Sequence, residues 1–204
     1  MPFNKLHSHL QEKLEQLEII TPTPFQSKAI PIIKSGANVY CAASNESGKT
    51  TTLILTTLQK LKCEEKGNAP RAVVLVENKE KALALYELFL WYTKYTSVRV
   101  YVGYEQLHID IQKSEIAMGT DILITTPQNM NKLFLLNGVS VSDLKIVSMD
   151  DAEILGVNSV HAAMLSITQS ILKCQYVLYT EKMSAKLDRY KDYFMERSKT
   201  VVIK

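Results

Sequence analysis

Residues 43–50 read Ala-Ser-Asn-Glu-Ser-Gly-Lys-Thr: a small residue, four further residues, and then Gly48-Lys49-Thr50. An apolar run over 39–43 leads into this stretch, and a helical pattern rich in Leu and Thr follows it, so it occupies a strand-to-helix turn. In such a turn, successive backbone N–H groups and the helix N-terminus form a positive concavity for phosphate oxygens. The stretch therefore predicts a phosphate-binding loop and a nucleoside-triphosphate-binding α/β domain.

Three residues of the loop carry the predicted chemistry. Gly48 permits close approach of the backbone to the phosphates, Lys49 brings a positive charge to the β- and γ-phosphates, and the Thr50 hydroxyl can ligate Mg²⁺. Glu46 opposes binding, because a carboxylate near a polyphosphate costs Coulomb energy unless it points outward. An ordinary strand–turn–helix with a chance Gly-Lys-Thr is the alternative, and the flanking elements disfavour it.

The rest of the chain alternates between short β-rich runs and helical stretches. Several of these runs are nearly all apolar, which is typical of strands covered on both faces of a parallel sheet. We therefore predict an α/β fold with a mostly parallel central sheet and helices on both faces. The expected strands are 39–43, 73–76, 98–102, 122–125, 146–149, 176–179 and 201–203, and the expected helices are 4–17, 50–61, 79–95, 160–172 and 184–197.

The composition is that of an ordinary globular protein, with 46% hydrophobic and 22% charged residues. Disordered, collagen-like and membrane-spanning classes are therefore disfavoured. The net charge of +3 permits a polyanionic partner without arguing for one. The three cysteines show no C-x-x-C pairing. Cys41 and Cys174 lie in or beside apolar runs, so we expect reduced thiols and a cytoplasmic location.

A second segment, Pro22-Thr23-Pro24-Phe25-Gln26, places Gln26 23 residues before Lys49. It resembles the Q motif with which DEAD-box RNA helicases read adenine. A Gln side chain offers a donor and an acceptor, which match the Hoogsteen edge of adenine. Taken alone, the segment is equally a proline-stiffened entry to a helix with a solvated Gln. Its spacing to the phosphate loop favours the resemblance.

A third segment, residues 147–153, reads Val-Ser-Met-Asp-Asp-Ala-Glu at the end of a buried strand. It resembles the Asp-Glu-Ala-Asp box of the same family with the two acidic partners exchanged. The resemblance places Asp150 on the carboxylate that holds Mg²⁺ through water, and Asp151 on the glutamate that polarises the attacking water. Aspartate is one methylene shorter, and a carboxylate about 1 Å out of place can lose roughly a hundredfold in rate. An acidic strand end that caps the next helix is the alternative.

The resemblance continues across nearly the whole chain with altered motifs. The family's Pro-Thr-Arg-Glu-Leu-Ala segment is matched at 77–82 only by Glu80 and Ala82, with Lys79 as a weak stand-in for its arginine. Thr126-Pro127 is kept without the Gly-Arg that follows it in the family. Residues 180–182, Thr-Glu-Lys, stand where the family has the Ser-Ala-Thr that couples hydrolysis to strand separation. The resemblance thus implies a missing coupling element and only weak RNA contact, through Lys79, Thr126 and Pro127.

The resemblance implies that residues 1–204 form one RecA-like domain, the first of a divergent DEAD-box RNA helicase, with no second RecA-like domain. Residues 1–38 would hold the N-terminal helix and the Gln26 segment, and 39–204 the doubly wound core. The implied cofactors are ATP and Mg²⁺. The implied partners are weakly bound RNA and a protein partner or second RecA-like domain, without a membrane. We expect very slow hydrolysis and negligible unwinding by this domain alone.

Two alternatives remain open. One is a pseudo-helicase interaction module with weak or lost nucleotide binding, and the less favoured one is an unrelated P-loop kinase or transferase. The residues implied as catalytic are Lys49, Asp150 and Asp151; those implied to hold Mg²⁺ are Thr50 and, through water, Asp150; and those implied to bind nucleotide are Gln26, Ala43, Ser44, Asn45, Glu46, Ser47, Gly48, Lys49, Thr50 and Thr51.

Overall fold

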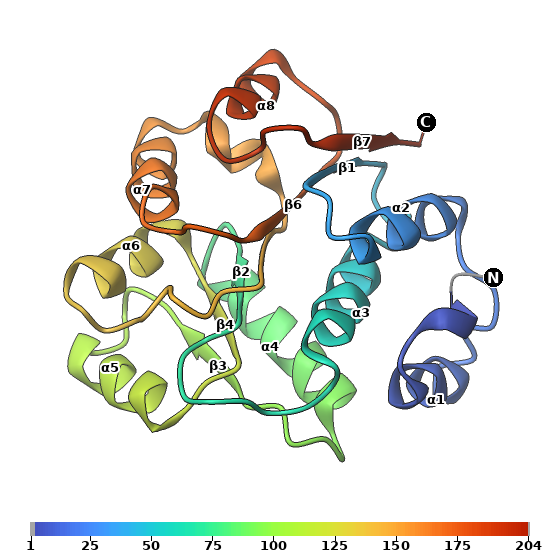
Figure 1. Cartoon of the computed structure of the whole chain (residues 1–204), viewed down its shortest axis with the longest axis horizontal. Coiled ribbons are helices and arrows are strands. Elements are labelled where there is room, and N and C mark those ends of the chain that lie inside the picture. Colours follow the sequence, from blue (N-terminus) through green and yellow to red (C-terminus); the bar gives the residue numbers. More distant parts are fainter. Residues whose placement is uncertain (1–2, 204) are drawn as a thin grey trace.

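The computed structural model describes residues 3–203, so Met1, Pro2 and Lys204, at the ends of the expected domain, lie outside the described residues. In the part of the chain that the structure describes, one seven-stranded sheet organises the fold, in the order β3-β4-β2-β5-β6-β1-β7 (Figure 1). Every pair of neighbouring strands is parallel, which confirms the predicted parallel α/β architecture. The strands are β1 (Val39–Ala42), β2 (Ala72–Leu75), β3 (Val100–Gly103), β4 (Ile122–Thr125), β5 (Ile146–Met149), β6 (Gln175–Thr180) and β7 (Lys199–Val202).

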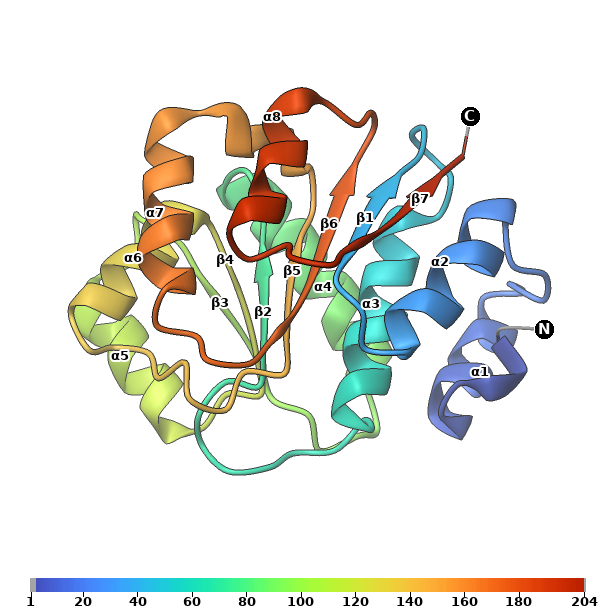
Figure 2. The same cartoon turned by 45° about the horizontal axis from the view of Figure 1, so that its top comes forward.

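The helices form a layer on each face of the sheet (Figure 2). Alternate side chains of each strand point to opposite faces, so Val39 and Cys41 join one hydrophobic core whereas Tyr40 joins the other. The first core lies under α1 (Ser8–Gln16), α2 (Pro24–Lys34), α3 (Lys49–Leu61) and α4 (Lys79–Thr93). The second lies under α5 (Ile109–Met118), α6 (Pro127–Leu135), α7 (Asn158–Thr168) and α8 (Ala185–Asp188).

The expected N-terminal helix over 4–17 is interrupted. A 3₁₀ turn, η1 (Phe3–Lys5), precedes α1, and the His7 side chain caps α1 by accepting a hydrogen bond from the backbone N–H of His9. Leu10 and Leu14 are buried, whereas Leu17 is 41% exposed because it lies beyond the end of the helix. Helices α5 and α6 were not among the expected elements.

The expected helix over 184–197 is also corrected. The chain forms only α8 and the 3₁₀ turn η3 (Arg189–Asp192), and then continues as loop to β7. Tyr190 explains the early stop, because its ring is fully buried and its hydroxyl donates to the Leu155 carbonyl at 3.0 Å. The backbone N–H groups of Tyr193 and Met195 both bond the Tyr190 carbonyl, which turns the chain. Tertiary packing here overrides a helical pattern.

The parallel sheet brings distant segments of the chain to one edge. The chain leaves β1, β2 and β5 at their carboxyl ends and enters the phosphate-loop turn, α4 and the acidic segment respectively. Ligands of open α/β sheets bind in the crevice outside these carboxyl ends. Within residues 3–203, no helix combines the length and apolar character required to cross a bilayer.

Candidate functional site

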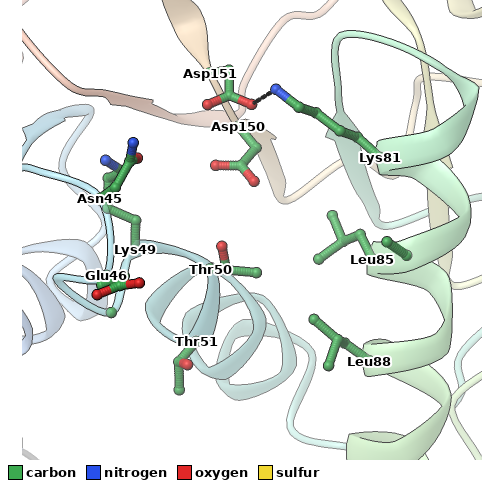
Figure 3. A pocket seen from close by; sticks show the side chains of 12 residues that line it. Asn45, Glu46, Lys49, Thr50, Thr51, Lys81, Leu85, Leu88, Asp150 and Asp151 are labelled. Atoms are coloured by element: carbon green, nitrogen blue, oxygen red, sulfur yellow. Dashed lines mark hydrogen bonds and ion pairs between the residues drawn. The ribbon is translucent and has the colours of Figure 1, made fainter.

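A cavity of about 580 Å³ opens at this edge of the sheet (Figure 3). The phosphate-loop turn forms one wall, helix α4 forms the opposite wall, and the end of β5 lies between them. Most of the residues implied by the sequence to bind nucleotide or metal therefore meet in one place. The lining residues are Asn45, Glu46, Gly48, Lys49, Thr50, Thr51, Lys81, Ala84, Leu85, Leu88, Asp150 and Asp151.

The turn from β1 into α3 has the backbone that an anion-binding loop requires. Gly48 is the N-cap of α3 and adopts φ 91°, and Glu46 also has a positive φ, of 62°. A Cβ atom on Gly48 would lie 2.7 Å from Nε2 of Gln26, so only glycine fits without displacement. The N-terminus of α3, with its unpaired N–H groups, consequently faces the cavity. The Glu46 side chain is exposed.

The ammonium group of Lys49 folds back onto its own loop. Its Nζ donates to the Ala43 carbonyl at 2.5 Å and to the Ser44 carbonyl at 3.1 Å, and the residue is 9% exposed. These backbone oxygens hold the cation where phosphate oxygens would compete for it. Ala43 and Ser44 thus contribute through their carbonyl groups, and neither lines the cavity.

Asp150 continues the β5 backbone, since its N–H donates to the Leu75 carbonyl of β2 at 2.9 Å. Burial, together with the negative charge of Asp151, raises the pKa of the Asp150 carboxyl to about 6. Asp150 and Thr50 both line the cavity, and carboxylate and hydroxyl oxygens suit Mg²⁺, which prefers oxygen ligands. The donor set therefore fits the metal that the resemblance implies.

Asp151 has a positive φ of 54° and an ion pair across the cavity. Its Oδ2 lies 2.5 Å from Nζ of Lys81, on the first turn of α4 (Figure 3). The same Nζ contacts Oε2 of Glu77 at 2.9 Å. Partial burial lowers the pKa of Lys81, but the hydrogen bonds from Asp151 and Glu77 outweigh it and raise the pKa above its ordinary value.

The acidic segment is also bonded to the end of β6. Oε1 of Glu153 accepts from the Thr180 hydroxyl at 2.5 Å and from the Glu181 backbone N–H at 2.6 Å. Residues 180–182 read Thr-Glu-Lys where the family has Ser-Ala-Thr. The Thr180 hydroxyl keeps a direct contact between the acidic segment and the end of β6, while the missing coupling of hydrolysis to strand separation stays a prediction.

Gln26 lies beneath the phosphate loop and does not line the cavity. Its Oε1 accepts from the Thr23 backbone N–H at 3.0 Å, and the Thr23 hydroxyl both accepts from the Gln26 N–H and donates to the Ser47 carbonyl at 2.7 Å. This capping box starts α2 and fastens it to the loop. Gln26 is 2% exposed, so in this structure it supports the loop from below.

The three residues implied to touch RNA lie outside the cavity. Lys79 begins α4, and its Nζ sits 4.8 Å from the ring centre of Tyr104. Thr126 and Pro127 are buried at the start of α6, where the Thr126 hydroxyl accepts from the Asn129 N–H and donates to the Glu105 carboxylate. A carboxylate therefore stands beside the retained Thr-Pro pair.

Sequence reasoning missed the wall formed by α4. Lys81 stands where the family's Pro-Thr-Arg-Glu-Leu-Ala segment has leucine, so the resemblance assigns it no role. A charged residue at an apolar position of an otherwise related motif was the available signal. Leu85 and Leu88 follow at helical spacing and complete the apolar part of the same wall.

The parallel sheet, the loop after β1 and the acidic segment after β5 define the class of P-loop α/β proteins. A family model described as DEAD/DEAH box helicase matches residues 23–189. The chain is 30% identical over 147 residues to a probable ATP-dependent RNA helicase, ddx42, of Dictyostelium discoideum. It is 30% identical over 156 residues to a probable ATP-dependent RNA helicase, DDX46, of Homo sapiens. The chain belongs to the DEAD/DEAH box helicase family.

These relatives are much longer proteins. The matches take in 71% and 74% of this chain but only 15% and 14% of ddx42 and DDX46. Among solved structures, S. cerevisiae Dbp5 bound to RNA and ADP BeF3 superposes with a TM-score of 0.86 at 18% identity, over 98% of this chain and 51% of that one. A point variant of Dbp5 bound to Nup159, a Gle1 variant, IP6 and ADP gives a TM-score of 0.85, over 97% and 52%. The fold is thus the RecA-like fold of DEAD-box helicases.

Proposed function

We propose that residues 1–204 act as the first RecA-like domain of a DEAD-box RNA helicase, binding ATP with Mg²⁺ in the 580 Å³ cavity. The observation that carries the proposal is the meeting of Lys49, Thr50 and Asp150 around one cavity at the N-terminus of α3. Lys49 would leave the Ala43 and Ser44 carbonyls for the phosphates, while Thr50 and Asp150 would hold Mg²⁺. The metal would neutralise charge on the polyphosphate.

Slow hydrolysis by this domain is part of the proposal. Asp151 has one methylene less than the glutamate of the family motif, and its carboxylate is held by Lys81 at 2.5 Å. Both features keep the carboxylate back from a water molecule that would attack the terminal phosphate. Displacements of about 1 Å cost roughly a hundredfold in rate. We therefore expect binding of ATP with very slow turnover.

Weak RNA contact is the second part. Lys79 offers a positive charge near the ends of β2 and β3, whereas Glu105 places a negative charge on Thr126, next to the end of β4. Phosphate contacts supply most of the sequence-independent affinity for nucleic acid. One lysine, with the Glu105 carboxylate on Thr126, supports only weak binding, and we expect negligible unwinding.

The test is calorimetric titration of the 204-residue chain with ATP and Mg²⁺. The proposal expects a micromolar dissociation constant, about −8 kcal/mol, that is lost in Lys49→Ala. Lys62→Ala is the matched control, since Lys62 is an exposed lysine at the far end of the same helix. If the titration of the unaltered chain gives no heat of binding, the proposal is wrong.

A pseudo-helicase interaction module is the second candidate. It is favoured by the Lys49 ammonium, which already has two carbonyl partners, and by Glu46, whose carboxylate lines the cavity. This candidate expects no measurable ATP binding by a folded chain. A protein partner or a second RecA-like domain would then be the principal ligand.

A further inference from the structure

Two lysines face the cavity from opposite walls. Lys49 reaches it from the phosphate loop, and Lys81 reaches it from the first turn of α4 (Figure 3). Their surroundings differ, because the Lys49 Nζ bonds two backbone carbonyls whereas the Lys81 Nζ bonds two carboxylates, those of Asp151 and Glu77. An ammonium group has three N–H donors, so Lys81 keeps one after both contacts.

The charged residues around the cavity give Lys81 an electrostatic role in the binding of a polyphosphate. Three carboxylates line it, on Glu46, Asp150 and Asp151, against the two lysines. Without Lys81 the lining of the cavity would carry three negatively charged residues and one positively charged residue. A polyphosphate entering such a site meets repulsion that a second ammonium offsets, and this effect falls off with distance.

The contact between Lys81 and Asp151 indicates which phosphate group of a bound polyphosphate would lie near Lys81. Lys49 belongs to the loop that receives the β- and γ-phosphates. Asp151 follows Asp150 at the end of β5, between the loop and α4 (Figure 3). A cation bonded to Asp151 therefore stands across the cavity from the loop, where the γ-phosphate of a bound triphosphate would be the phosphate nearest to it.

We propose that Lys81 is a second phosphate-binding lysine of this site, and that it makes the site prefer nucleoside triphosphates over diphosphates. The inference rests on the proposed function, since it requires nucleotide in the cavity. On entry of a triphosphate, Lys81 shares its N–H donors between Asp151 and a γ-phosphate oxygen. A diphosphate does not extend that far and leaves Lys81 with its two carboxylates.

The experiment compares the dissociation constants of two probes in the presence of Mg²⁺. One is ADP, and the other is the non-hydrolysable ATP analogue with an imido group between the β- and γ-phosphates. In Lys81→Gln, affinity for the analogue should fall roughly tenfold, the range of one charge-assisted hydrogen bond. Affinity for ADP should change by less than about twofold, which is within the reach of a remote charge.

Two further variants separate charge from fold. Lys81→Arg keeps the cation and should retain the preference for the triphosphate analogue. Lys94→Gln removes the same charge at the other end of α4, about 20 Å away along the helix, and should leave both constants unchanged. Thermal unfolding monitored by circular dichroism confirms that each variant is folded.

The outcomes divide cleanly. Equal weakening of both nucleotides in Lys81→Gln, or no weakening of either, overturns the role of Lys81 while the proposed function stands. If the unaltered chain binds neither nucleotide, the proposed function and the role of Lys81 fall together. Loss of the analogue alone supports both.

Discussion

Gln26 lies directly against Gly48: a Cβ atom on Gly48 would be 2.7 Å from the side-chain Nε2 of Gln26. Helix α2 therefore touches the phosphate loop at the one residue of the loop where a side chain is excluded. The hydrogen bond from the Thr23 hydroxyl to the Ser47 carbonyl reinforces the same junction. The shape of the loop consequently depends on α2, a helix that precedes it in the chain and ends at Lys34.

Gly48→Ala tests this junction. The new methyl group meets Gln26, and alanine also has to adopt the left-handed conformation, so we expect a loss of about 2–4 kcal/mol in the free energy of unfolding. Gly67→Ala is a matched control, because Gly67 has φ 66° with nothing within 4 Å of its Cβ position. That control should lose only about 1–2 kcal/mol. Urea unfolding gives both values, and equal losses would contradict the contact with Gln26.

Asp150→Asn should stabilise the chain in the absence of nucleotide and metal. Burial raises the pKa of this carboxyl to about 6 from its ordinary value of 3.8. The folded state thus binds the proton more tightly than the unfolded state, so ionisation of Asp150 costs stability as pH rises from about 4 through 6. At pH values above about 7 we expect Asp150→Asn to gain about 1–3 kcal/mol.

The pH dependence supplies the control for Asp150. Below about pH 3 the carboxyl is protonated in both states, and the stability difference between the variant and the unaltered chain should vanish. The urea midpoints of Asp150→Asn and of the unaltered chain, measured across this pH range, show whether the difference in stability vanishes in acid. An Asp150→Asn protein that is no more stable than the original near neutral pH would show that the site imposes no such cost.

Asp121 should behave in the opposite way. It is fully buried, at the opposite, amino edge of the sheet; burial raises its pKa, but hydrogen bonds from Arg99 and Arg71 outweigh this and lower it. The contacts measure 2.9 Å to Nε of Arg99 and 2.6 Å to Nη2 of Arg71. Its contribution is therefore present above the unfolded pKa of about 3.9 and is lost as pH falls through the lower folded value.

We expect Asp121→Asn to cost about 3–5 kcal/mol near neutral pH, because the fully buried Asp121 carboxylate is the charged partner of two guanidinium groups, of which that of Arg71 is itself buried. The variant lacks the titrating carboxyl, so its free energy of unfolding should be lower at every pH but should fall less steeply in acid than that of the unaltered chain. Asp143→Asn, at an exposed aspartate, should stay within about 0.5 kcal/mol. Guanidinium or urea unfolding at two pH values separates the two variants; similar stabilities would refute the buried ion-pair cluster.

Glu105→Gln should strengthen RNA binding. The variant removes a negative charge from the Thr126 hydroxyl while keeping a group that accepts the same hydrogen bond. We expect affinity for a single-stranded RNA to rise a few-fold at low salt, with the gain shrinking as salt increases. Fluorescence anisotropy measures both. Glu15→Gln, on α1, makes the same change of net charge on a different surface and should have no comparable effect.

The parts predicted correctly are those that local pattern determines. All seven expected strands are present, and their ends lie within two residues of the expected ones. Apolar runs between turns are a local signal, so they can be read from the sequence. The turn at 43–50 was equally readable, since its glycine and its flanking elements are contiguous. The structure accordingly places Lys49 and Asp150 around one cavity, as parallel strands require.

The parts not predicted depend on contacts between distant segments. Lys81 becomes a site residue only because β2 and β5 are neighbours in the sheet, which brings α4 beside Asp151. The early stop of the 184–197 helix follows from the burial of Tyr190 against residues of η2 (Ala152–Gly156). The position of Gln26 was partly readable, because Thr23-Pro24-Phe25-Gln26 has the spacing of a capping box.

The acidic segment after β5 is anchored at both of its ends. Asp151 is tied to α4 through Lys81, and Glu153 is tied to the end of β6 through Thr180. One residue, Ala152, separates these anchors, so the segment works as a short strap between two structural elements. Any displacement of α4 relative to β6 must either rotate the strap, and Asp150 with it, or break one of the two bonds. The strap therefore gives Asp150 a mechanical link to β6, which does not line the cavity.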